Sequence, residues 1–291
     1  MRYKETLKVP IKTRQLSSGI GVEVLDLDLR SNIDEATFKD IRKAWTDNVI
    51  LLFRNQTLNN EQHVAFSRRF GTLDNHDAIA RLRDPDAHEI LPVLNIPGEN
   101  RLRVGAQWHS DLSHSVNPPQ ASLLRCEEIP PIGGDTMFSN MFLAYDELSD
   151  TMKKVVDPLW CIHDLTIARH NVGKYEEVRK RQPPVAQPLV RVHPENGRKA
   201  LYVSEFASAS IVGMTLEESR PLLDFLFRHT SRPEFTYRHR WAPGDLIIWD
   251  NRSATHLALD DYDFGYARRL YRTTVLGEVS GRLAQPAEIV T

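Results

Sequence analysis

The chain has 291 residues, of which 41% are hydrophobic and 26% charged, a composition that excludes a disordered or collagen-like protein. Its formal net charge of −2 excludes the overall positive field that draws a protein to nucleic acid or anionic lipid, so neither is an expected partner. The two cysteines are too few for a disulfide scaffold, and no run of about 18 apolar residues exists to span a membrane. Because the N-terminus also lacks the apolar core of a signal peptide, we expect a protein of the reducing cytoplasm.

The N-terminal part of the sequence predicts a hairpin followed by a helix. Residues Leu7 to Leu29 alternate in polarity and break at Ser17-Ser18-Gly19, which is typical of two short paired strands. From Asp34 to Thr46 the apolar residues recur at helical spacing, and acidic residues lie in the first turn. We therefore expect this helix to bury Phe38, Ile41 and Trp45.

A strand, a second helix and a long irregular segment follow. Asn48 to Gln56 is a short apolar run between polar turns, which predicts a buried strand. Asn60 to Phe70 predicts a helix that begins at asparagines suited to capping and ends at Gly71. Asp77 to Ala106 lacks periodicity, so we expect one strand flanked by long loops, which in compact domains are usually functional.

The rest of the chain predicts more strands than helices. Strand-like patterns lie at residues 121–129, 135–141, 235–241, 245–251 and 268–278, and a hairpin at 187–204 turns at 195–197. Helical patterns lie near residues 142–152, 172–181 and 216–229. Regular alternation of strands and helices, a GxGxxG motif and a P-loop are all missing. The pattern therefore favours an antiparallel β-core with helices outside it, in one domain spanning residues 1–291.

The sharpest local signal is AQWHSDLSH, in which one residue separates His109 from Asp111. On an extended strand both side chains would face one side, so an imidazole and a carboxylate would converge. Two histidines and one carboxylate on one face of an octahedral ion leave three positions open, the arrangement of non-haem Fe(II) oxygenases. By itself the pair is more typical of the polar face of a half-exposed strand than of a metal site.

The third ligand must come from a distant segment. Among the 11 histidines, His256 has the most suggestive context, because it follows the apolar strand 245–251 at the start of a polar segment. His114 lies off the strand face of His109, and we expect it either behind the ligands or at the surface. The other histidines considered stand in contexts without a carboxylate partner and are interpreted as structural or surface residues: His163, His170, His193, His229 and His239.

Six blocks share a further pattern in chain order: NVILLFRNQTLNNEQHVAFSRRFGTL, WHSD, PPIGGDT, VRVHPENGRKALYV, YRHRWAPGDLIIWDNRSATH and RRLYRTTVLGE. Together they resemble the taurine dioxygenase and 2,4-dichlorophenoxyacetate dioxygenase (TauD/TfdA) family of Fe(II)/2-oxoglutarate enzymes. The resemblance implies a mostly β fold with flanking helices around a double-stranded β-helix, a cupin-like jelly roll. It also implies that His109, Asp111 and His256 are the iron ligands.

The resemblance further implies where 2-oxoglutarate binds. Thr136 in the GGDT block and Arg268 are implied to hold its distal carboxylate, a role that suits a hydroxyl donor and a planar guanidinium. The spacing from His256 leaves Arg269 as the alternative partner. We prefer Arg268, because Arg272 then follows at the RxxxR spacing of the family.

A substrate site is implied beside the cofactors. In taurine-type members the second arginine, here Arg272, holds an anionic group with help from a histidine, here His76, and the backbone N–H of Leu112 is a further candidate contact. A small anionic organic substrate is therefore implied, such as a sulfonate, a sulfate ester or an aryloxy-carboxylate. Gly105 stands where the taurine branch has asparagine, which argues against taurine itself. Phe206 is as consistent with a pocket wall as with the core.

The implied reaction is hydroxylation by O2, in which 2-oxoglutarate chelates iron and is converted to succinate and CO2, often with collapse of the hydroxylated product. Related halogenases have Ala or Gly at the position of Asp111, so hydroxylation is expected, while desaturation and epoxidation would use the same ligands. Two other interpretations are open: a metal-dependent hydrolase on the same triad and a non-catalytic jelly-roll binding module. A homodimer or homotetramer is a further open expectation.

Overall fold

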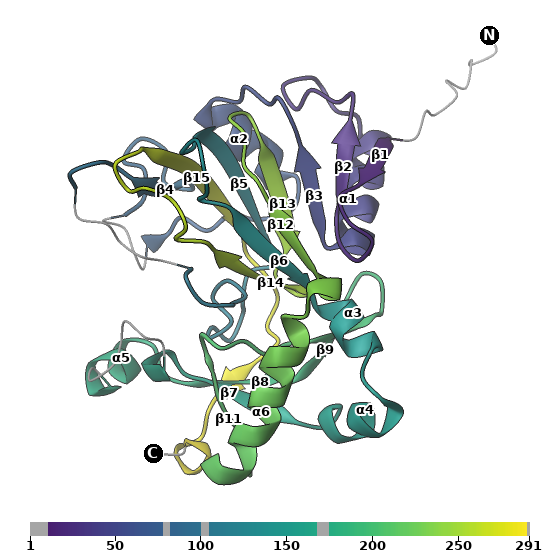
Figure 1. Cartoon of the computed structure of the whole chain (residues 1–291), viewed down its shortest axis with the longest axis vertical. Coiled ribbons are helices and arrows are strands. Elements are labelled where there is room, and N and C mark those ends of the chain that lie inside the picture. Colours follow the sequence, from purple (N-terminus) through teal and green to yellow (C-terminus); the bar gives the residue numbers. More distant parts are fainter. Residues whose placement is uncertain (1–10, 78–81, 100–104, 168–174, 290–291) are drawn as a thin grey trace, which may run out of the picture.

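The computed structural model describes residues 11–77, 82–99, 105–167 and 175–289 and shows a β-rich protein with helices at its periphery (Figure 1). In spatial order, the large sheet contains β1 (Lys12–Gln15), β2 (Val22–Leu25), β3 (Ile50–Phe53), β13 (Leu246–Asp250), β5 (Ala121–Glu128), β15 (Arg268–Val275) and β4 (Leu91–Asn95). A smaller sheet contains β12 (Thr236–His239), β6 (Thr136–Asn140) and β14 (Ala254–Ala258).

A third sheet lies beside these two and contains β11 (Ser208–Ile211), β7 (Trp160–His163), β8 (Val185–Pro188) and β16 (Arg282–Leu283) (Figure 1). The strands β9 (Val190–Val192) and β10 (Lys199–Leu201) pair as a hairpin. Among the described strands only β2 and β3 pair in parallel, and all other pairs are antiparallel. The predicted antiparallel β-core is confirmed.

The large sheet is buried on both faces at β3 and β13, which explains why these two strands are almost continuously apolar. Successive residues of β3 alternate between a core shared with the smaller sheet and a second core beneath α1 (Glu35–Asn48) and α2 (Asn60–Arg68). Phe38, Ile41 and Trp45 all lie in this second core, so α1 buries the face that its sequence predicts.

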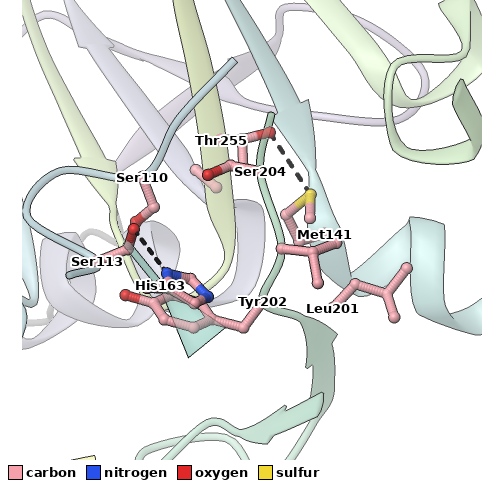
Figure 2. Close-up of a pocket in the computed structure, with 10 residues that line it drawn as sticks. Ser110, Ser113, Met141, His163, Leu201, Tyr202, Ser204 and Thr255 are labelled. Carbon is pink, nitrogen blue, oxygen red and sulfur yellow. Dashed lines mark hydrogen bonds between the residues drawn. The ribbon is translucent and has the colours of Figure 1, made fainter. Parts of the chain in front are cut away.

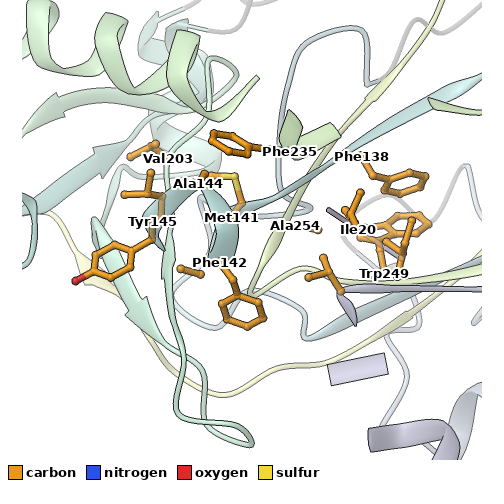
Figure 3. Packing of buried hydrophobic residues seen from close by; sticks show 14 of the residues in the cluster. Ile20, Phe138, Met141, Phe142, Ala144, Tyr145, Val203, Phe235, Trp249 and Ala254 are labelled. Carbon is orange, nitrogen blue, oxygen red and sulfur yellow. The ribbon is translucent and has the colours of Figure 1, made fainter. Parts of the chain in front are cut away.

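The first core lies between the large and the smaller sheet and continues beneath α6 (Leu216–Thr230) (Figure 3). Phe138 of β6 packs on Trp249 of β13, with 5.7 Å between the ring centroids. Ala254 of β14 and Leu270 of β15 belong to the same cluster. Inward-pointing side chains from these strands therefore meet in one interior, and the polar ones among them form the site described below.

The helix predicted near residues 142–152 is wrong in extent, because two short helices replace it: α3 (Met141–Asp146) and α4 (Asp150–Val156). The side chain of Asn140 accepts hydrogen bonds from the first turn of α3, and Ser149 Oγ accepts one from the N–H of Met152 in α4. A serine inside the predicted segment thus caps a new helix instead of continuing the old one.

The other predicted helices and strands are confirmed where the structure describes them, including α5 (Tyr175–Arg181). Residues 7–10 of the predicted hairpin, residues 172–174 of the predicted helix and His170 lie outside the described residues.

Cys126 and Cys161 are buried free thiols. None of the helices in the described ranges has the length and apolar character needed to span a membrane. The organisation in a single domain stays a prediction.

Candidate metal centre

The backbone brings His109 beside His256 through a pair of hydrogen bonds. The N–H of His109 donates to the carbonyl oxygen of His256 (3.0 Å), and the N–H of His256 donates to that of His109 (2.7 Å). His256 lies in the middle of β14, which pairs with β6. The expectation that His256 lies just past the end of strand 245–251 is therefore wrong: the chain turns after Asp250 and a new strand carries the histidine.

The segment that carries His109 and Asp111 is not the extended strand that their spacing predicts. Only His109 makes a bridge, and the chain turns at Asp111, with Leu112 in the left-handed region (φ +46°). The side chains converge all the same, since Nε2 of His109 lies 3.8 Å from Oδ1 of Asp111. A turn held by other segments thus replaces strand geometry as the cause of convergence.

The three side chains direct their donor atoms toward one point. Oδ1 of Asp111 lies 4.0 Å from Nε2 of His256, and the two imidazole centroids are 4.0 Å apart. One donor atom from each of the three residues lies within 4.8 Å of the others. In the described part of the chain this is the only such group of His, Cys, Asp or Glu side chains.

The protonation states also suit a metal ion. Nδ1 of His109 lies 2.8 Å from the carbonyl oxygen of Gln107 and so carries the proton, which leaves the lone pair on Nε2. Burial lowers the pKa of His109. Burial also holds the pKa of His256 well below its ordinary value. Burial alone would raise the pKa of Asp111, but Arg272 and the histidines lower it overall. Two neutral imidazoles and one carboxylate are the forms that bind metal.

This donor set fits Fe(II), because two histidines and one carboxylate with open positions are typical of non-haem iron sites. Beside it lies a cavity with about 770 Å³ of empty space, part of it open to solvent. Both histidines line this cavity, and its walls come from the large and the smaller sheet. The donor set therefore borders a space in which further ligands of a metal ion could bind.

Thr136 and Arg268 line the same cavity from β6 and β15. Both are buried, and Nε of Arg268 donates to the carbonyl oxygen of Gly134 (3.2 Å). The indole N–H of Trp241 donates to Oγ1 of Thr136 (3.0 Å), so the hydroxyl proton of Thr136 is free to point to another acceptor. Arg269 is directed away from this cavity and pairs with Glu128 at the surface (3.3 Å). The cavity therefore contains Arg268 and not its neighbour.

Arg272 also lines the cavity, and its Nη1 donates to Oδ1 of Asp111 (2.9 Å). His76 is buried beside Arg272 without lining the cavity, and it adopts a left-handed backbone conformation (φ +55°). Nε of Arg272 and Nε2 of His76 are buried without a hydrogen-bond partner among the described residues. Leu112 is 39% exposed and does not line the cavity, so it is not grouped with these two residues.

Gly105, His114 and Phe206 lie near His109. Gly105 lines the cavity with φ +79°, and a Cβ there would lie 3.2 Å from Cε1 of His109, so this backbone disfavours an asparagine. His114 is half-buried, and burial is the main cause that lowers its pKa to about 4. Phe206 packs on His109 with 5.6 Å between ring centroids and belongs to neither core. His114 and Phe206 therefore lie near the ligands without joining them.

The expectation that certain histidines have no carboxylate partner is wrong for two of them. Nε2 of His193 lies 2.9 Å from Asp250, and Nε2 of His239 lies 3.0 Å from Asp245. Both pairs are fully buried, and each partner lies on a different sequence segment or across a turn, which spacing along the chain does not reveal. They support the fold around the site.

Residues that position the turn after His109 were not predicted at all. Ser113 contacts Nδ1 of His163 in the third sheet at 3.0 Å (Figure 2), and the pKa of this buried imidazole is lowered to about 3. Nε2 of Gln187 donates to the carbonyl oxygens of Ser113 (3.2 Å) and Ser115 (2.7 Å). The side-chain oxygen of Asn251 accepts a hydrogen bond from the N–H of Asp111 (3.2 Å). The only available signal was that Asn251 lies in the WDNRSATH block.

Comparison with known proteins agrees with this geometry. Residues 12–274 match the family described as "Taurine catabolism dioxygenase TauD, TfdA family". The alpha-ketoglutarate-dependent 2,4-dichlorophenoxyacetate dioxygenase of Burkholderia sp. (strain RASC) is 34% identical over 271 residues, which cover 88% of this chain and 91% of that protein. The alpha-ketoglutarate-dependent sulfate ester dioxygenase of Pseudomonas putida is 32% identical over 278 residues, covering 89% and 87%. The crystal structure of a taurine dioxygenase from Burkholderia xenovorans matches with a TM-score of 0.82 and 37% identity, covering 96% of this chain and 98% of that one.

Proposed function

The chain belongs to the taurine catabolism dioxygenase TauD, TfdA family, and we propose that it hydroxylates a small anionic organic substrate, with His109, Asp111 and His256 as the ligands of Fe(II). As a member of this family it is a 2-oxoglutarate-dependent dioxygenase with a jelly-roll core. When bound, Fe(II) and 2-oxoglutarate supply the activation of O2, coupled to conversion of 2-oxoglutarate to succinate and CO2.

The observation that carries the proposal is that the triad, Thr136 and the two arginines of the RxxxR pair surround one cavity. Arg268 and Arg272 lie on the same face of β15 as Leu270, since alternate residues of a strand share a face. Thr136, through its hydroxyl proton, and Arg268, through its guanidinium N–H groups, would hold the distal carboxylate of 2-oxoglutarate when it is bound. A hydrolase on the same triad would leave Thr136 and Arg268 without a role.

The anionic group of the substrate binds at Arg272 and His76. Arg272 uses Nη1 for Asp111 and keeps Nε unpartnered, and His76 keeps Nε2 unpartnered in a buried position. Buried polar atoms without a partner are costly, so two of them side by side support a bound acceptor. Sulfonates, sulfate esters and aryloxy-carboxylates offer such an acceptor, and relatives named for 2,4-dichlorophenoxyacetate and for sulfate esters fall in these classes.

The body of the substrate packs on the apolar part of the cavity. Val93 and Leu94 of β4, Leu124 of β5 and Leu259 after β14 line it. These side chains exclude water from the space next to the histidines and hold the substrate's C–H bond toward the open side of the triad. Specificity then depends on the fit of the substrate body, while Arg272 sets the requirement for negative charge.

The proposed substrate class is tested by incubating the enzyme with Fe(II), 2-oxoglutarate, O2 and a panel of small molecules. Succinate release above the uncoupled rate is expected for some sulfonates, sulfate esters or aryloxy-carboxylates, and not for their neutral amide or alcohol counterparts. Coupled turnover confined to cationic or neutral compounds would contradict the anion site at Arg272 and His76.

Replacing His76 with phenylalanine keeps a ring at this position and removes the donor. We expect the KM for the anionic substrate to rise about 10-fold or more, because a hydrogen bond to a charged group contributes about 1.5–3 kcal/mol. The KM for 2-oxoglutarate is expected to stay the same, since Thr136 and Arg268 line the cavity and His76 does not. Steady-state kinetics with each substrate varied separately measures both values, and equal changes in the two would argue against the role of His76.

A further inference from the structure

Asn251, in the turn between β13 and β14, contacts Asp111 by two routes, one direct and one through Ser122. We infer that Asn251 and Ser122 form a relay that fixes the orientation of the Asp111 carboxylate and thereby the affinity of the site for its metal ion. The inference rests on the proposed function, because it takes Asp111 as a ligand. Both are positioning residues, since neither belongs to the cluster of donor atoms.

The side-chain amide of Asn251 has only one orientation that satisfies its neighbours. Its Oδ1 lies 2.9 Å from Nε1 of Trp249 and 3.2 Å from the backbone nitrogen of Asp111. An indole N–H and a backbone N–H are donors only, so both require the amide oxygen on this side. The amide nitrogen must then face Ser122, where Nδ2 donates to Oγ at 3.0 Å.

This orientation determines what the hydroxyl of Ser122 does. A serine hydroxyl has a single proton, and Oγ already accepts from Asn251, so the proton is available to another acceptor. That acceptor is Oδ2 of Asp111, at 2.7 Å. Ser122 and Asn251 are both 0% exposed, so water does not compete for these bonds. The two pairing strands β13 and β5 keep the residues in register, because Trp249 lies opposite Ser122.

The relay selects which oxygen of Asp111 faces the histidines. With Oδ2 held by Ser122, Oδ1 is the atom that lies 3.8 Å from Nε2 of His109 and 4.0 Å from Nε2 of His256. Without the relay only Arg272 would hold the carboxylate, through Oδ1, so rotation about its last side-chain bond would be less restricted and binding a metal ion would cost additional ordering. The site therefore depends on a hydrogen bond made on its far side.

Asn251 also holds the backbone on both sides of the relay. Its carbonyl oxygen accepts from Oγ of Ser110 (2.7 Å), and its N–H donates to the carbonyl oxygen of Gln120 (2.9 Å). The residue before Asp111 and the start of β5 are thus fixed to the same turn. Since His256 follows in β14, one asparagine connects the segments that carry all three ligands.

The test measures Mn(II) affinity of the metal-free full-length protein by calorimetry, together with its thermal unfolding midpoint. The variants are Ser122→Ala, Asn251→Ala and the double variant. The matched control is Ser253→Ala, which removes a buried hydroxyl from the same turn that has no hydrogen-bond partner among the described residues. Binding of Mn(II) requires no turnover, so the readout is independent of activity.

We expect Ser122→Ala to weaken Mn(II) binding about 10- to 100-fold, the usual effect of removing a group that orients a metal ligand. The double variant is expected to bind as weakly as Asn251→Ala alone, because both changes interrupt one relay and their effects are not additive. The midpoint of metal-free Ser122→Ala is expected to lie below that of Ser253→Ala, because only the first change leaves buried polar atoms of Asn251 and Asp111 without a partner, and Mn(II) affinity is therefore compared below both midpoints, where each variant is folded. If Asn251→Ala does not fold, the comparison of Ser122→Ala with Ser253→Ala decides.

Two results would overturn the inference in distinguishable ways. If Asp111→Ala loses Mn(II) binding while Ser122→Ala binds within about twofold of the parent protein, the relay is wrong and the proposed ligand set stands. If Asp111→Ala binds Mn(II) as tightly as the parent protein, the ligand set itself is wrong and the relay with it.

Discussion

Replacing His109 with alanine is expected to abolish the weak visible charge-transfer band that the anaerobic protein develops with Fe(II) and 2-oxoglutarate. His109 supplies one of three donor atoms and has its lone pair directed to the site by the contact with Gln107. Its loss should weaken Fe(II) binding by more than about 100-fold, since residues that merely orient a ligand already contribute 10- to 100-fold. Turnover of 2-oxoglutarate to succinate should be lost with it.

The control for this experiment is His114→Ala. His114 lies five residues further along and is half-buried near His109, but it is not part of the donor cluster. We expect its band and its metal affinity to stay close to those of the parent protein. A band that survives in His109→Ala and disappears in His114→Ala would show that the ligand set is assigned to the wrong histidine. No band in the parent protein, with iron shown to be bound, would contradict the proposed 2-oxoglutarate site.

Replacing Arg268 with alanine is expected to raise the KM for 2-oxoglutarate about 100-fold. Arg268 is buried in the cavity next to Thr136, and removing one partner of a buried charge pair costs about 2–5 kcal/mol. The KM of Arg268→Lys should lie between the values of the parent protein and of Arg268→Ala, because lysine keeps the charge and loses the planar pair of donors. Initial rates of succinate formation at varied 2-oxoglutarate, with the other substrate saturating, measure the effect.

The neighbouring arginine provides a matched control. Arg269 lies on the face of β15 opposite to Arg268, and both side chains of its ion pair with Glu128 are exposed to solvent. Such pairs contribute little, so Arg269→Ala should leave the KM for 2-oxoglutarate within about twofold of the parent value. A large rise in Arg269→Ala and none in Arg268→Ala would reverse the assignment.

Local patterns in the sequence were sufficient for most of the secondary structure. The apolar spacing of Phe38, Ile41 and Trp45 predicted the face that α1 buries, because a helix must direct such a stripe to a core. The same reasoning failed at residues 142–152, where Ser149 caps a new helix. Helical spacing alone does not show whether a serine lies inside a helix or begins another one.

Metal-site prediction from spacing was right about the residues that converge and wrong about the cause. The HxD pair was expected to lie on a strand, whereas Asp111 lies in a turn held by Ser113, Gln187 and Asn251. His256 was singled out by its position after the apolar strand 245–251, and the resemblance of its segment to a family then supported it. The carboxylate partners of His193 and His239 were not predicted, because these pairs come together only when the chain folds.

The sequence by itself determined the β-rich class, the helical faces and, through ordered motifs, the family and its set of candidate ligands. These features depend on local periodicity and on residue types at fixed spacing. Only the tertiary structure decided that Arg268 and not Arg269 enters the cavity, that Leu112 lies outside it, and that Asn251 reaches Asp111 through Ser122. The contact between Asn251 and Ser122 joins residues 129 positions apart, and its geometry is set by strand register and by the packing of two sheets, which no local pattern encodes.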